Sequence, residues 1–442
     1  MPARCPAFHP LRPIALLALL STACAPTPDG SADDPPDAAV DPADASADAD
    51  APDATPDALP DAVPDAEPEP VEPCGPSGQT WAVDAEGPAG QFHPAIAADG
   101  DGVWLTYSQV TPGLSTFDIF ATRIGCDGEA TVEPFEVSAD PEFSDVDPSI
   151  AVGDDRILVA WTNDVSDADP NLIARYRLLD RQGDPLGEPR ALVTQRAGDD
   201  FVGGQWMVQV AATDDGFVIV GSRGVEVRSA FQVFVQRLDA EGDPIGPTLS
   251  PEQDMTQQLE PDVAVERDGT IRVAWGEGDQ GAGRIVAGAW APPFDGDLRL
   301  QQVAPAPAGG VRLSAGRHVL ATAVVQRGGG ADIGVYDLDG DSRIHVGESG
   351  QIDLQPGIAQ VGDVAVVAWF RRIRGNSSGL WLQTLEIDGE LRVRGPARAI
   401  ELQDAAAPYP MAITALADGR VALAWAAGES PGFRIYWRVE EP

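Results

Sequence analysis

The chain has 442 residues, with 70 acidic against 29 basic side chains, and its formal net charge is −41 at pH 7. Nucleic acids and anionic lipid surfaces attract proteins through basic patches, so this balance excludes nucleic acid as an expected partner. Only four cysteines and four histidines are present, so we expect no Cys/His metal set, no thiol nucleophile and no cofactor.

Residues 1–23 have the layout of a secretory signal: two arginines, a short apolar run and then small residues. The following LLSTAC resembles the lipobox of bacterial lipoproteins, although Ser21 stands where that motif prefers leucine. The resemblance implies that Cys24 is lipidated, and Ala25, which is not aspartate, favours the outer membrane. The alternative is an ordinary A-x-A cleavage site at the same place, which would release a soluble protein.

Residues 24–73 are predicted to be a disordered tether. After the cysteine they are almost wholly Asp, Ala and Pro, with fifteen acidic residues and no lysine, arginine or aromatic residue. Such a segment cannot bury enough apolar surface to offset the entropy of ordering it. Two interpretations are open, a stalk that lifts the next domain off a membrane and a tolerated low-complexity insert.

Cys74 and Cys126 are the two cysteines that remain after export. An oxidising compartment favours a disulfide between them, which we predict as a structural staple at the start of the next domain. Two free thiols with a redox role are the alternative, but neither cysteine belongs to a C-x-x-C pair.

Residues 74–442 contain a segment that recurs about every fifty residues. Each copy has an apolar strand that often opens with proline, a second strand that often ends in an aromatic residue, and a third and fourth strand joined by an Asp/Gly turn. The clearest copies are HPAIAADGDGVWLTY, DPSIAVGDDRILVAW, EPDVAVERDGTIRVAW, QPGIAQVGDVAVVAW and YPMAITALADGRVALAW. Degenerate copies lie at 207–222 and 311–326, and the third strand at 283–290 lacks the usual turn.

The count is seven repeats, and the last one stops after its third strand, FRIYWRVEE. The segment GQTWAVD at 78–84 precedes the first repeat and is similar to the other fourth strands. A strand from the N-terminal side that completes the last unit closes a ring and leaves no sheet edge. The sequence therefore predicts an all-β fold, a seven-bladed β-propeller in which Trp81 lies beside the strand that holds Tyr436.

The repeats also resemble a known group. The order of apolar-Ala-Trp, then Ile-x-Ala-x-Arg, then an Asp/Gly turn is similar to propeller repeats of secreted and surface proteins of bacteria. That resemblance implies a propeller that serves as a scaffold, a binding module or part of an enzyme. Sialidase-like propellers are relatives in shape, but the S-x-D-x-G-x-x-W box is missing here.

No catalytic motif is found. The chain has no G-x-S-x-G elbow, no phosphate-binding glycine loop and no H-E-x-x-H. Glycosidases need only two carboxylates at a suitable separation, but among so many acids no pair can be assigned. We therefore expect a protein that is not an enzyme, with a glycan-active hydrolase as the alternative.

One stretch suggests a calcium site. DLDGDSRIHVGE places four carboxylates at the first, third, fifth and twelfth positions of an EF-hand-like loop. These are Asp337, Asp339, Asp341 and Glu348. The sixth position is Ser342 and not glycine, and the segment coincides with a predicted hairpin, so an acidic β-turn is favoured.

Two further groups have a functional and a structural interpretation. The terminal aromatic residues Tyr107, Trp161, Trp275, Trp369 and Trp425 could ring a channel, but we predict that they pack between blades. Arg371, Arg372 and Arg374 form the densest basic cluster. They could hold an anionic ligand or pair with neighbouring carboxylates, and pairing is favoured.

The sequence therefore predicts a lipid-anchored propeller of the cell envelope that binds protein or glycan partners through loops on one face. A purely structural envelope protein is a further alternative.

Overall fold

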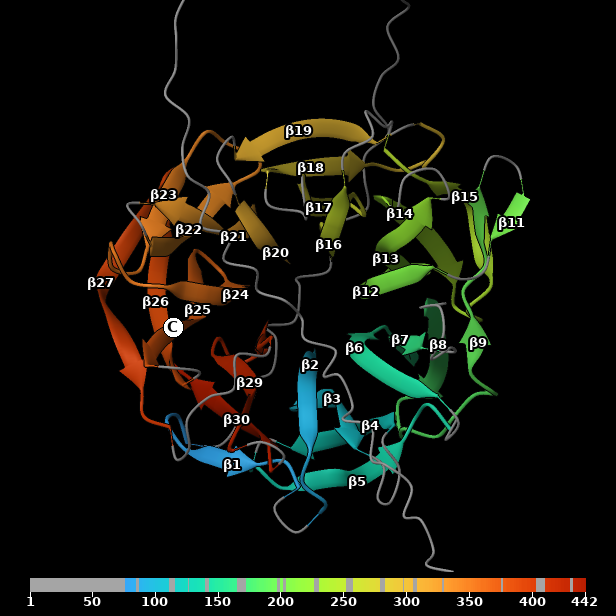
Figure 1. Cartoon of the computed structure of the whole chain (residues 1–442), viewed down its shortest axis with the longest axis horizontal. Helices are drawn as coiled ribbons and strands as arrows, with labels where there is room; N and C mark the ends of the chain where they lie inside the picture. The colour runs from blue at the N-terminus through green and yellow to red at the C-terminus, as the bar shows by residue number, and fades with distance from the viewer. Residues whose placement is uncertain are drawn as a thin grey trace, which may run out of the picture. The chain divides into compact units, whose positions relative to one another are not determined.

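In the computed structural model, seven four-stranded antiparallel sheets, called blades 1 to 7, stand in a ring (Figure 1). The structure describes residues 76–442 apart from 85–86, 111–115, 126, 140–142, 165–171, 197–198, 202–203, 226–229, 252–256, 279–282, 297, 305–307, 328–329, 375–376, 403–409 and 430–431. Every regular element in these ranges is a strand. The predicted seven-bladed β-propeller is confirmed. The predicted signal, the tether, Cys24, Cys74 and Cys126 lie outside the described residues.

The strands of blades 1 to 4 follow one another in chain order. Blade 1 is β2 (Gln91–Asp99), β3 (Gly102–Val110), β4 (Phe117–Gly125) and β5 (Ala130–Glu136). Blade 2 is β6 (Ser144–Val152), β7 (Arg156–Asp164), β8 (Leu172–Asp180) and β9 (Arg190–Ala191). Blade 3 is β12 (Gln205–Thr213), β13 (Gly216–Val225), β14 (Ala230–Asp239) and β15 (Pro244–Leu249). Blade 4 is β16 (Gln258–Val265), β17 (Ile271–Glu277), β18 (Arg284–Trp290) and β19 (Arg299–Ala304).

The remaining blades keep this order, and only the last one takes a strand from elsewhere. Blade 5 is β20 (Ala308–Ala315), β21 (Val319–Arg327), β22 (Gly330–Asp337) and β23 (Arg343–Val346). Blade 6 is β24 (Asp353–Val361), β25 (Val364–Arg374), β26 (Ser377–Ile387) and β27 (Leu391–Ile400). Blade 7 is β28 (Ala412–Ala415), β29 (Val421–Ala427), β30 (Arg434–Glu440) and β1 (Thr80–Ala82). A separate hairpin, β10 (Thr194–Arg196) and β11 (Asp199–Phe201), lies between blades 2 and 3.

The ring is closed at blade 7 by β1, as the sequence predicts. β1 pairs antiparallel with β30, with Trp81 opposite Trp437 and Ala82 opposite Tyr436. The indoles of Trp81 and Trp437 stack with their centroids 4.8 Å apart. Figure 1 shows the blue strand β1 beside the red strand β30. The two ends of the domain are thereby joined through one sheet.

The hydrophobic core lies between the blades. Each second strand is buried, and in β29 all seven residues are buried. The terminal aromatic residues are 0–1% exposed, and each packs in the layer between two blades: Tyr107, Trp161, Trp275, Trp369 and Trp425. Trp161 of blade 2, for example, shares a cluster with Trp104 and Ile119 of blade 1. The core interpretation of these residues is confirmed.

Aspartate and glycine form the outer hairpin turns. Asp180 ends β8, and its Oδ1 accepts hydrogen bonds from the backbone N–H groups of Gln182 and Asp184 at 2.9 and 2.8 Å. Gly183 follows with φ +93°, in the left-handed region that glycine adopts without a steric cost. The blade 3 hairpin repeats this arrangement at Asp239 and Gly242.

Buried glutamines connect neighbouring blades near the starts of the first strands. Gln91 is 0% exposed, and its Oε1 accepts a hydrogen bond of 2.9 Å from the backbone N–H of Ile435 in blade 7. Gln258 of blade 4 accepts in the same way from Val233 of blade 3, at 3.0 Å. These amides satisfy N–H groups at the starts of third strands, which would otherwise be buried without a partner.

In blade 2 the corresponding residue is Asp145, which is fully buried. Its Oδ1 accepts hydrogen bonds from the indole of Trp161 at 2.8 Å and the amide of Asn163 at 2.6 Å. Burial raises the pKa of Asp145 to about 7, despite these bonds and the nearby Arg175, which lower it. Because the folded state holds this proton more tightly than the unfolded state, the stability of the fold decreases as pH rises from about 4 to about 7.

We therefore expect Asp145→Asn to stabilise the protein at pH 8, because the amide replaces a carboxylate that is ionised there. The gain is at most about 4 kcal/mol, from a shift of about three pKa units. At pH 4 the carboxyl group is protonated in the folded state and only about half ionised in the unfolded state, so most of this difference should be lost. Urea unfolding at pH 4, 6 and 8 measures this. Equal stabilities of the two proteins at pH 8 would contradict it.

Candidate functional site

The first strand of a blade lies nearest the axis, and it carries a β-bulge close to its start. In six blades the register with the second strand shifts there: between Phe92/Ala95, Val146/Ser149, Trp206/Gln209, Leu259/Asp262, Gly309/Arg312 and Leu354/Gly357. The extra residues include one with positive φ in each blade: His93, Asp147, Met207, Glu260, Gly310 and Gln355. We call these six residues the axial ring.

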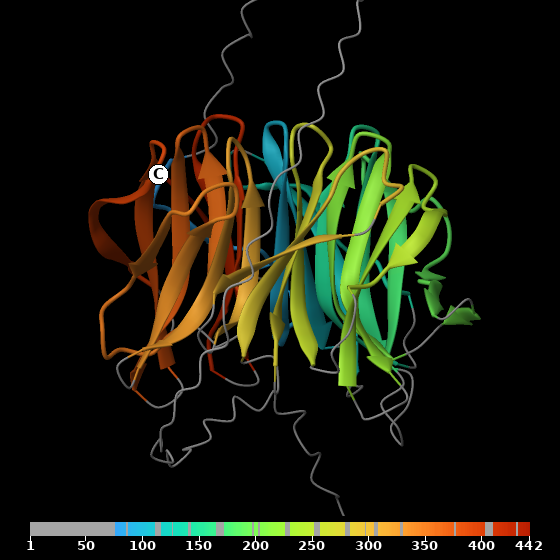
Figure 2. The ribbon, with the colours of Figure 1, turned by 90° about the horizontal axis from the view of Figure 1, so that it is seen from above.

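The axial ring lies toward one face of the propeller. Phe92 is opposite Ser108, close to the end of the second strand, and the third strand starts from that same end. We call the side with the ends of the second strands the loop face, and the side with the first-to-second strand turns the turn face. In Figure 2 the strands run between these two faces.

Backbone strain is concentrated in the axial ring. Five of its six members are not glycine, yet their φ values are between 49° and 53°. A left-handed conformation is uncommon for residues other than glycine, although asparagine, aspartate and histidine adopt it more readily than the rest, and it persists where the surrounding structure imposes it. Proline follows four of the six, as Pro94, Pro148, Pro261 and Pro356. Proline suits this inner edge of the sheet, since it presents no unpaired N–H to the channel.

The side chains of neighbouring blades meet at the axial ring. His93 Nδ1 of blade 1 lies 2.6 Å from Asp147 Oδ1 of blade 2, and the two side chains are 23% and 27% exposed. Burial favours the neutral acid, but the charge and hydrogen bond of His93, the indole of Trp206 and the charge of Arg312 together lower the pKa of Asp147. Arg312 belongs to blade 5, so side chains from three other blades act on this carboxylate of blade 2.

A second contact crosses from blade 4 to blade 5. Glu260 Oε2 accepts a hydrogen bond of 2.6 Å from the backbone N–H of Gly310. Just below it, Asp262 Oδ2 accepts one of 2.7 Å from the N–H of Leu313, and burial raises the pKa of Asp262 although Arg312 lowers it. The axial ring and its neighbours thus hold one carboxylate favoured in the ionised form and one favoured in the neutral form.

Sequence reasoning missed the axial ring, although one signal was present. The dipeptides His-Pro, Asp-Pro, Glu-Pro and Gln-Pro open four repeats, and the polar residue before proline is the strained one. The sequence shows proline as the mark of a strand start. It does not show that the preceding residue is left-handed, because none of these residue types requires that conformation.

The predicted basic cluster is divided by the structure. Arg371 is 7% exposed, and its guanidinium makes two hydrogen bonds to buried Asp353, at 2.7 and 3.0 Å. It also lies over the ring of Trp381 at 4.4 Å. Arg371 thus pairs with a carboxylate, which is the interpretation that the sequence favours. Arg372 is partly exposed on the same strand, and the side chain of Arg374 lies outside the described residues.

The four carboxylates of the predicted calcium loop are also separated. Asp337 ends β22 and Asp339 lies in the following turn, where their ligand atoms are grouped with those of His318. Asp341 is exposed in that turn. Glu348 lies beyond β23, where its Oε2 is 3.2 Å from Arg371 Nη1. The segment forms the hairpin from β22 to β23, which is the acidic β-turn alternative.

A cavity of about 620 Å³ opens at the turn face between blades 1 and 2. Its ionic residues are Asp99, Asp101, Arg123 and Arg181. Arg123 Nε donates to Asp99 at 2.8 Å, Arg181 donates to the same carboxylate, and Arg123 Nη2 donates to Asp101 at 2.6 Å. Two charges of each sign are paired with one another, so this cavity does not favour an ionic ligand.

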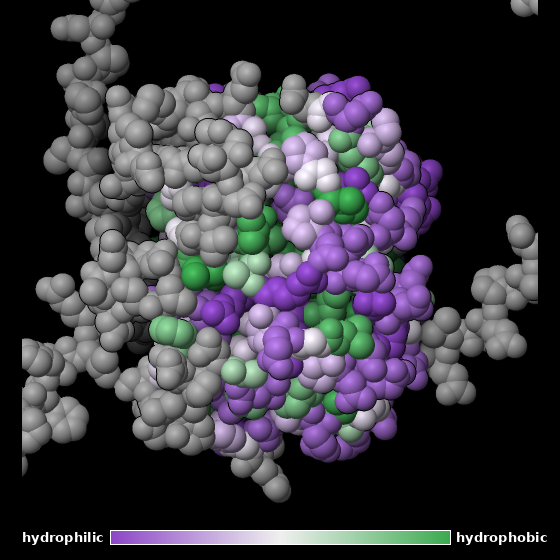
Figure 3. Space-filling view, turned by 90° about the vertical axis from the view of Figure 1, so that its right-hand side faces the viewer, coloured by the Kyte–Doolittle hydropathy of each residue, from purple (hydrophilic) through white to green (hydrophobic). Residues whose placement is uncertain are grey.

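The outer rim offers no continuous apolar surface in the view of Figure 3, where hydrophilic side chains cover most of the described surface and apolar ones form small separate spots. The exposed large apolar residues belong to three different blades: Leu186, Val193, Leu300 and Val393. Single exposed residues of this kind are normal for soluble domains. Within the described ranges, no helix has the length and apolarity needed to cross a membrane.

Comparisons with known proteins concern the fold. No family profile and no curated protein matches the sequence. A protein of unknown function from Dyadobacter fermentans is similar in structure, with a TM-score of 0.51 and 9% identity over 83% of this chain and 99% of that chain. The N11 neuraminidase-like protein of an A/flat-faced bat/Peru strain has a TM-score of 0.46 and 10% sequence identity, over 86% of this chain and 94% of that chain. A thermostable family-43 glycoside hydrolase has a TM-score of 0.36 and 12% sequence identity, over 74% of this chain and 98% of that chain. At 9% identity, the similarity to the Dyadobacter fermentans protein concerns the fold alone.

Proposed function

We propose that this protein is a binding module whose ligand, the end of a glycan chain, docks on the axis at the loop face. The observation that carries the proposal is the axial ring. Polar side chains occupy strained positions where glycine would be less costly, and those of different blades converge there. Strain of this kind clusters at sites where geometry is held for a ligand.

The chemistry of the axial ring suits a hydroxyl-rich ligand. Carboxylates accept hydrogen bonds from hydroxyl groups, and the imidazole of His93 and the amide of Gln355 both donate and accept them. Aromatic residues directly precede two ring members: Phe92, whose ring lies 5.6 Å from that of Phe117, and Trp206, 5.8 Å from Phe231. A few polar groups beside aromatic faces are typical of small-ligand sites.

We expect His93→Ala and Asp147→Asn each to weaken glycan binding about tenfold or more, because the first removes a hydrogen-bonding ring and the second removes the negative charge of an accepting carboxylate. A glycan array finds the ligand, and titration calorimetry then measures the affinities. Asp154→Asn, at an exposed carboxylate of the turn face, is the matched control and should bind as the wild type does. Equal binding by all four proteins would place the ligand elsewhere and refute the axial site.

A second candidate function is glycan hydrolysis by paired carboxylates at the same place. It is favoured by the opposite pKa shifts of Asp147 and Asp262, because such a pair supplies one acid and one base. Asp262 would donate the proton to the leaving group, and Asp147 would act as base or nucleophile. A screen for hydrolysis of aryl glycosides tests this: turnover that disappears in both Asp147→Asn and Asp262→Asn supports hydrolysis, and no turnover by the wild type contradicts it.

We further propose that the propeller is displayed at the bacterial envelope by a lipid on Cys24 and the acidic segment that follows. The lipobox-like LLSTAC supports this, and so does the composition of residues 25–73. Mass spectrometry of the mature protein should find an acylated Cys24 at its N-terminus. A mature chain that starts beyond this cysteine would contradict the anchor.

A further inference from the structure

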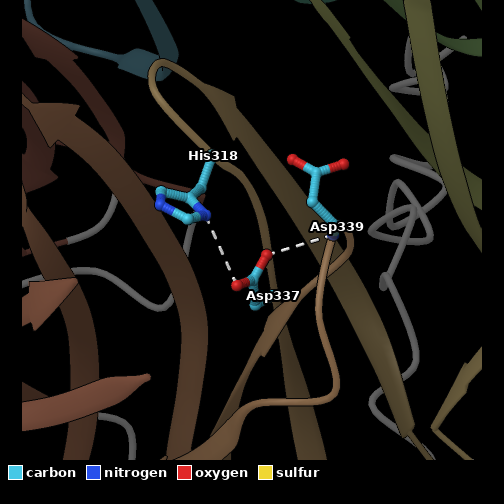
Figure 4. A group of neighbouring side chains, drawn as sticks. All are labelled: His318, Asp337 and Asp339. Carbon is cyan, nitrogen blue, oxygen red and sulfur yellow. Dashed lines mark hydrogen bonds and ion pairs between the residues drawn. The ribbon is translucent and has the colours of Figure 1, made fainter. Parts of the chain in front are cut away.

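The turn face of blade 5 carries a group of metal-ligating side chains that is separate from the axial ring. His318 lies in the turn between β20 and β21, and Asp337 and Asp339 lie where β22 turns toward β23. One ligand atom of each residue lies within 4.8 Å of the others. Figure 4 shows Asp337 between the other two, with its carboxylate directed toward the imidazole. We propose that these three residues bind a divalent transition-metal ion, with zinc as the representative.

The spacing of His318 and Asp337 fits two ligands of one ion better than two hydrogen-bond partners. His318 Nδ1 lies 3.5 Å from Asp337 Oδ2. A hydrogen bond between such groups is about 2.7–2.9 Å long. Two ligand atoms bonded to one tetrahedral zinc ion, each at about 2.0–2.1 Å, lie about 3.3 Å from each other. His318 and Asp337 could therefore bind one ion with little movement, whereas the ligand atom of Asp339, which lies within 4.8 Å of theirs, would move closer.

The carboxylates are held in place by the backbone of the two turns. Asp337 Oδ1 accepts a hydrogen bond of 3.0 Å from the N–H of Asp339, and Asp339 Oδ2 accepts one of 3.0 Å from the N–H of Val319. Each carboxylate oxygen has two lone pairs, so these bonds leave capacity for a metal. Gly340 leaves space beside Asp337, since a Cβ there would lie 3.0 Å from Oδ2. Hydrogen bonds of this kind to metal-ligating side chains orient the ligands and raise the affinity of the site for the metal.

The local charge also favours a cation. Arg272 of β17 donates to Asp339 Oδ1 at 2.7 Å and to Glu266. One guanidinium thus stands among three carboxylates, those of Glu266, Asp337 and Asp339. The surplus of negative charge attracts a divalent ion, and Arg272 retains Glu266 as a partner if the ion takes Asp339.

The kind of donor decides which ion is expected. One imidazole nitrogen with two carboxylate oxygens suits zinc and similar transition metals, whereas calcium takes six to eight oxygen ligands. This set differs from the calcium loop suggested by the sequence, since His318 replaces Asp341 and Glu348. The ion would join the two turns of blade 5 and raise its stability.

The test is titration of the full chain with zinc chloride at pH 7.5, followed by calorimetry and by thermal unfolding. We expect one zinc site, weakened at least about tenfold in His318→Gln and in Asp339→Asn. His345→Gln, which removes the exposed histidine of β23, is the matched control and should retain the site. Zinc should raise the melting temperature of the wild type and of this control, and not that of His318→Gln.

Three outcomes would overturn the proposal: no zinc site in the wild type, the same zinc affinity in His318→Gln as in the wild type, or tighter binding of calcium than of zinc. Melting curves without metal show whether each variant is folded. Should one of them fail to fold, the other variant provides the test, and the comparison of zinc with calcium on the wild type needs no variant. None of these readouts depends on glycan binding at the opposite face.

Discussion

Replacing Arg371 by alanine is expected to lower the free energy of unfolding by about 3–5 kcal/mol, because the change leaves Asp353 as an unpaired buried charge. Asp353 is 0% exposed, and the structure gives it two hydrogen bonds from this guanidinium. Arg371 also covers the ring of Trp381, so packing is lost together with the charge. Urea unfolding followed by tryptophan fluorescence measures the change.

The matched control for Arg371 is Arg372→Ala, one residue further along β25. Successive side chains of a strand point to opposite faces, so this variant tests the loss of an arginine without the loss of the buried pair. A change within about 0.5 kcal/mol is expected for it. The double variant Arg371→Met with Asp353→Leu should recover much of the lost stability, since it removes both charges. If Arg371→Ala were as mild as Arg372→Ala, the pair would have no structural role.

Replacing Trp81 by alanine is expected to lower the stability by about 2–4 kcal/mol and to open the seam of the ring. Trp81 is partly buried, so the cost falls below that of a fully buried tryptophan. It stacks on Trp437 of blade 7, and its indole also lies against the Asp127–Gly128 turn of blade 1, where a Cβ on Gly128 would come within 2.7 Å of it. One side chain thus joins the first and last blades.

Two measurements separate seam opening from ordinary loss of packing. Release of β1 would expose the edge of β30, and an exposed edge pairs with other chains. We therefore expect Trp81→Ala to form oligomers in size-exclusion chromatography and to be cleaved early near residue 84. Phe135→Ala removes an outer-strand aromatic residue that packs on Trp104 away from the seam, so it should lose stability and stay monomeric. Monomeric, protease-resistant Trp81→Ala would refute the seam role.

The proposed site and the proposed metal group differ in how far the sequence could suggest them. Asp337 and Asp339 stood out because acidic residues alternate there, but His318 lies on another turn and joins them only in space. The pair of His93 and Asp147 comes from two repeats, and Asp262 and Arg312 come from two others. Pattern analysis within one repeat cannot find contacts between repeats, since the distance between them depends on how the blades stack.

What the sequence determined by itself is the architecture, because the physics of a blade is local. Alternating apolar strands, Asp/Gly turns at regular spacing and a last repeat without its fourth strand are sufficient to predict seven blades, the closure by β1 and the burial of the terminal aromatic residues. Only the tertiary structure decided where the polar chemistry lies. Bulges put five non-glycine residues into left-handed conformations, and the register of β24 against β25 placed Arg371 opposite Asp353. Both depend on the register between strands, which the types of the residues alone do not determine.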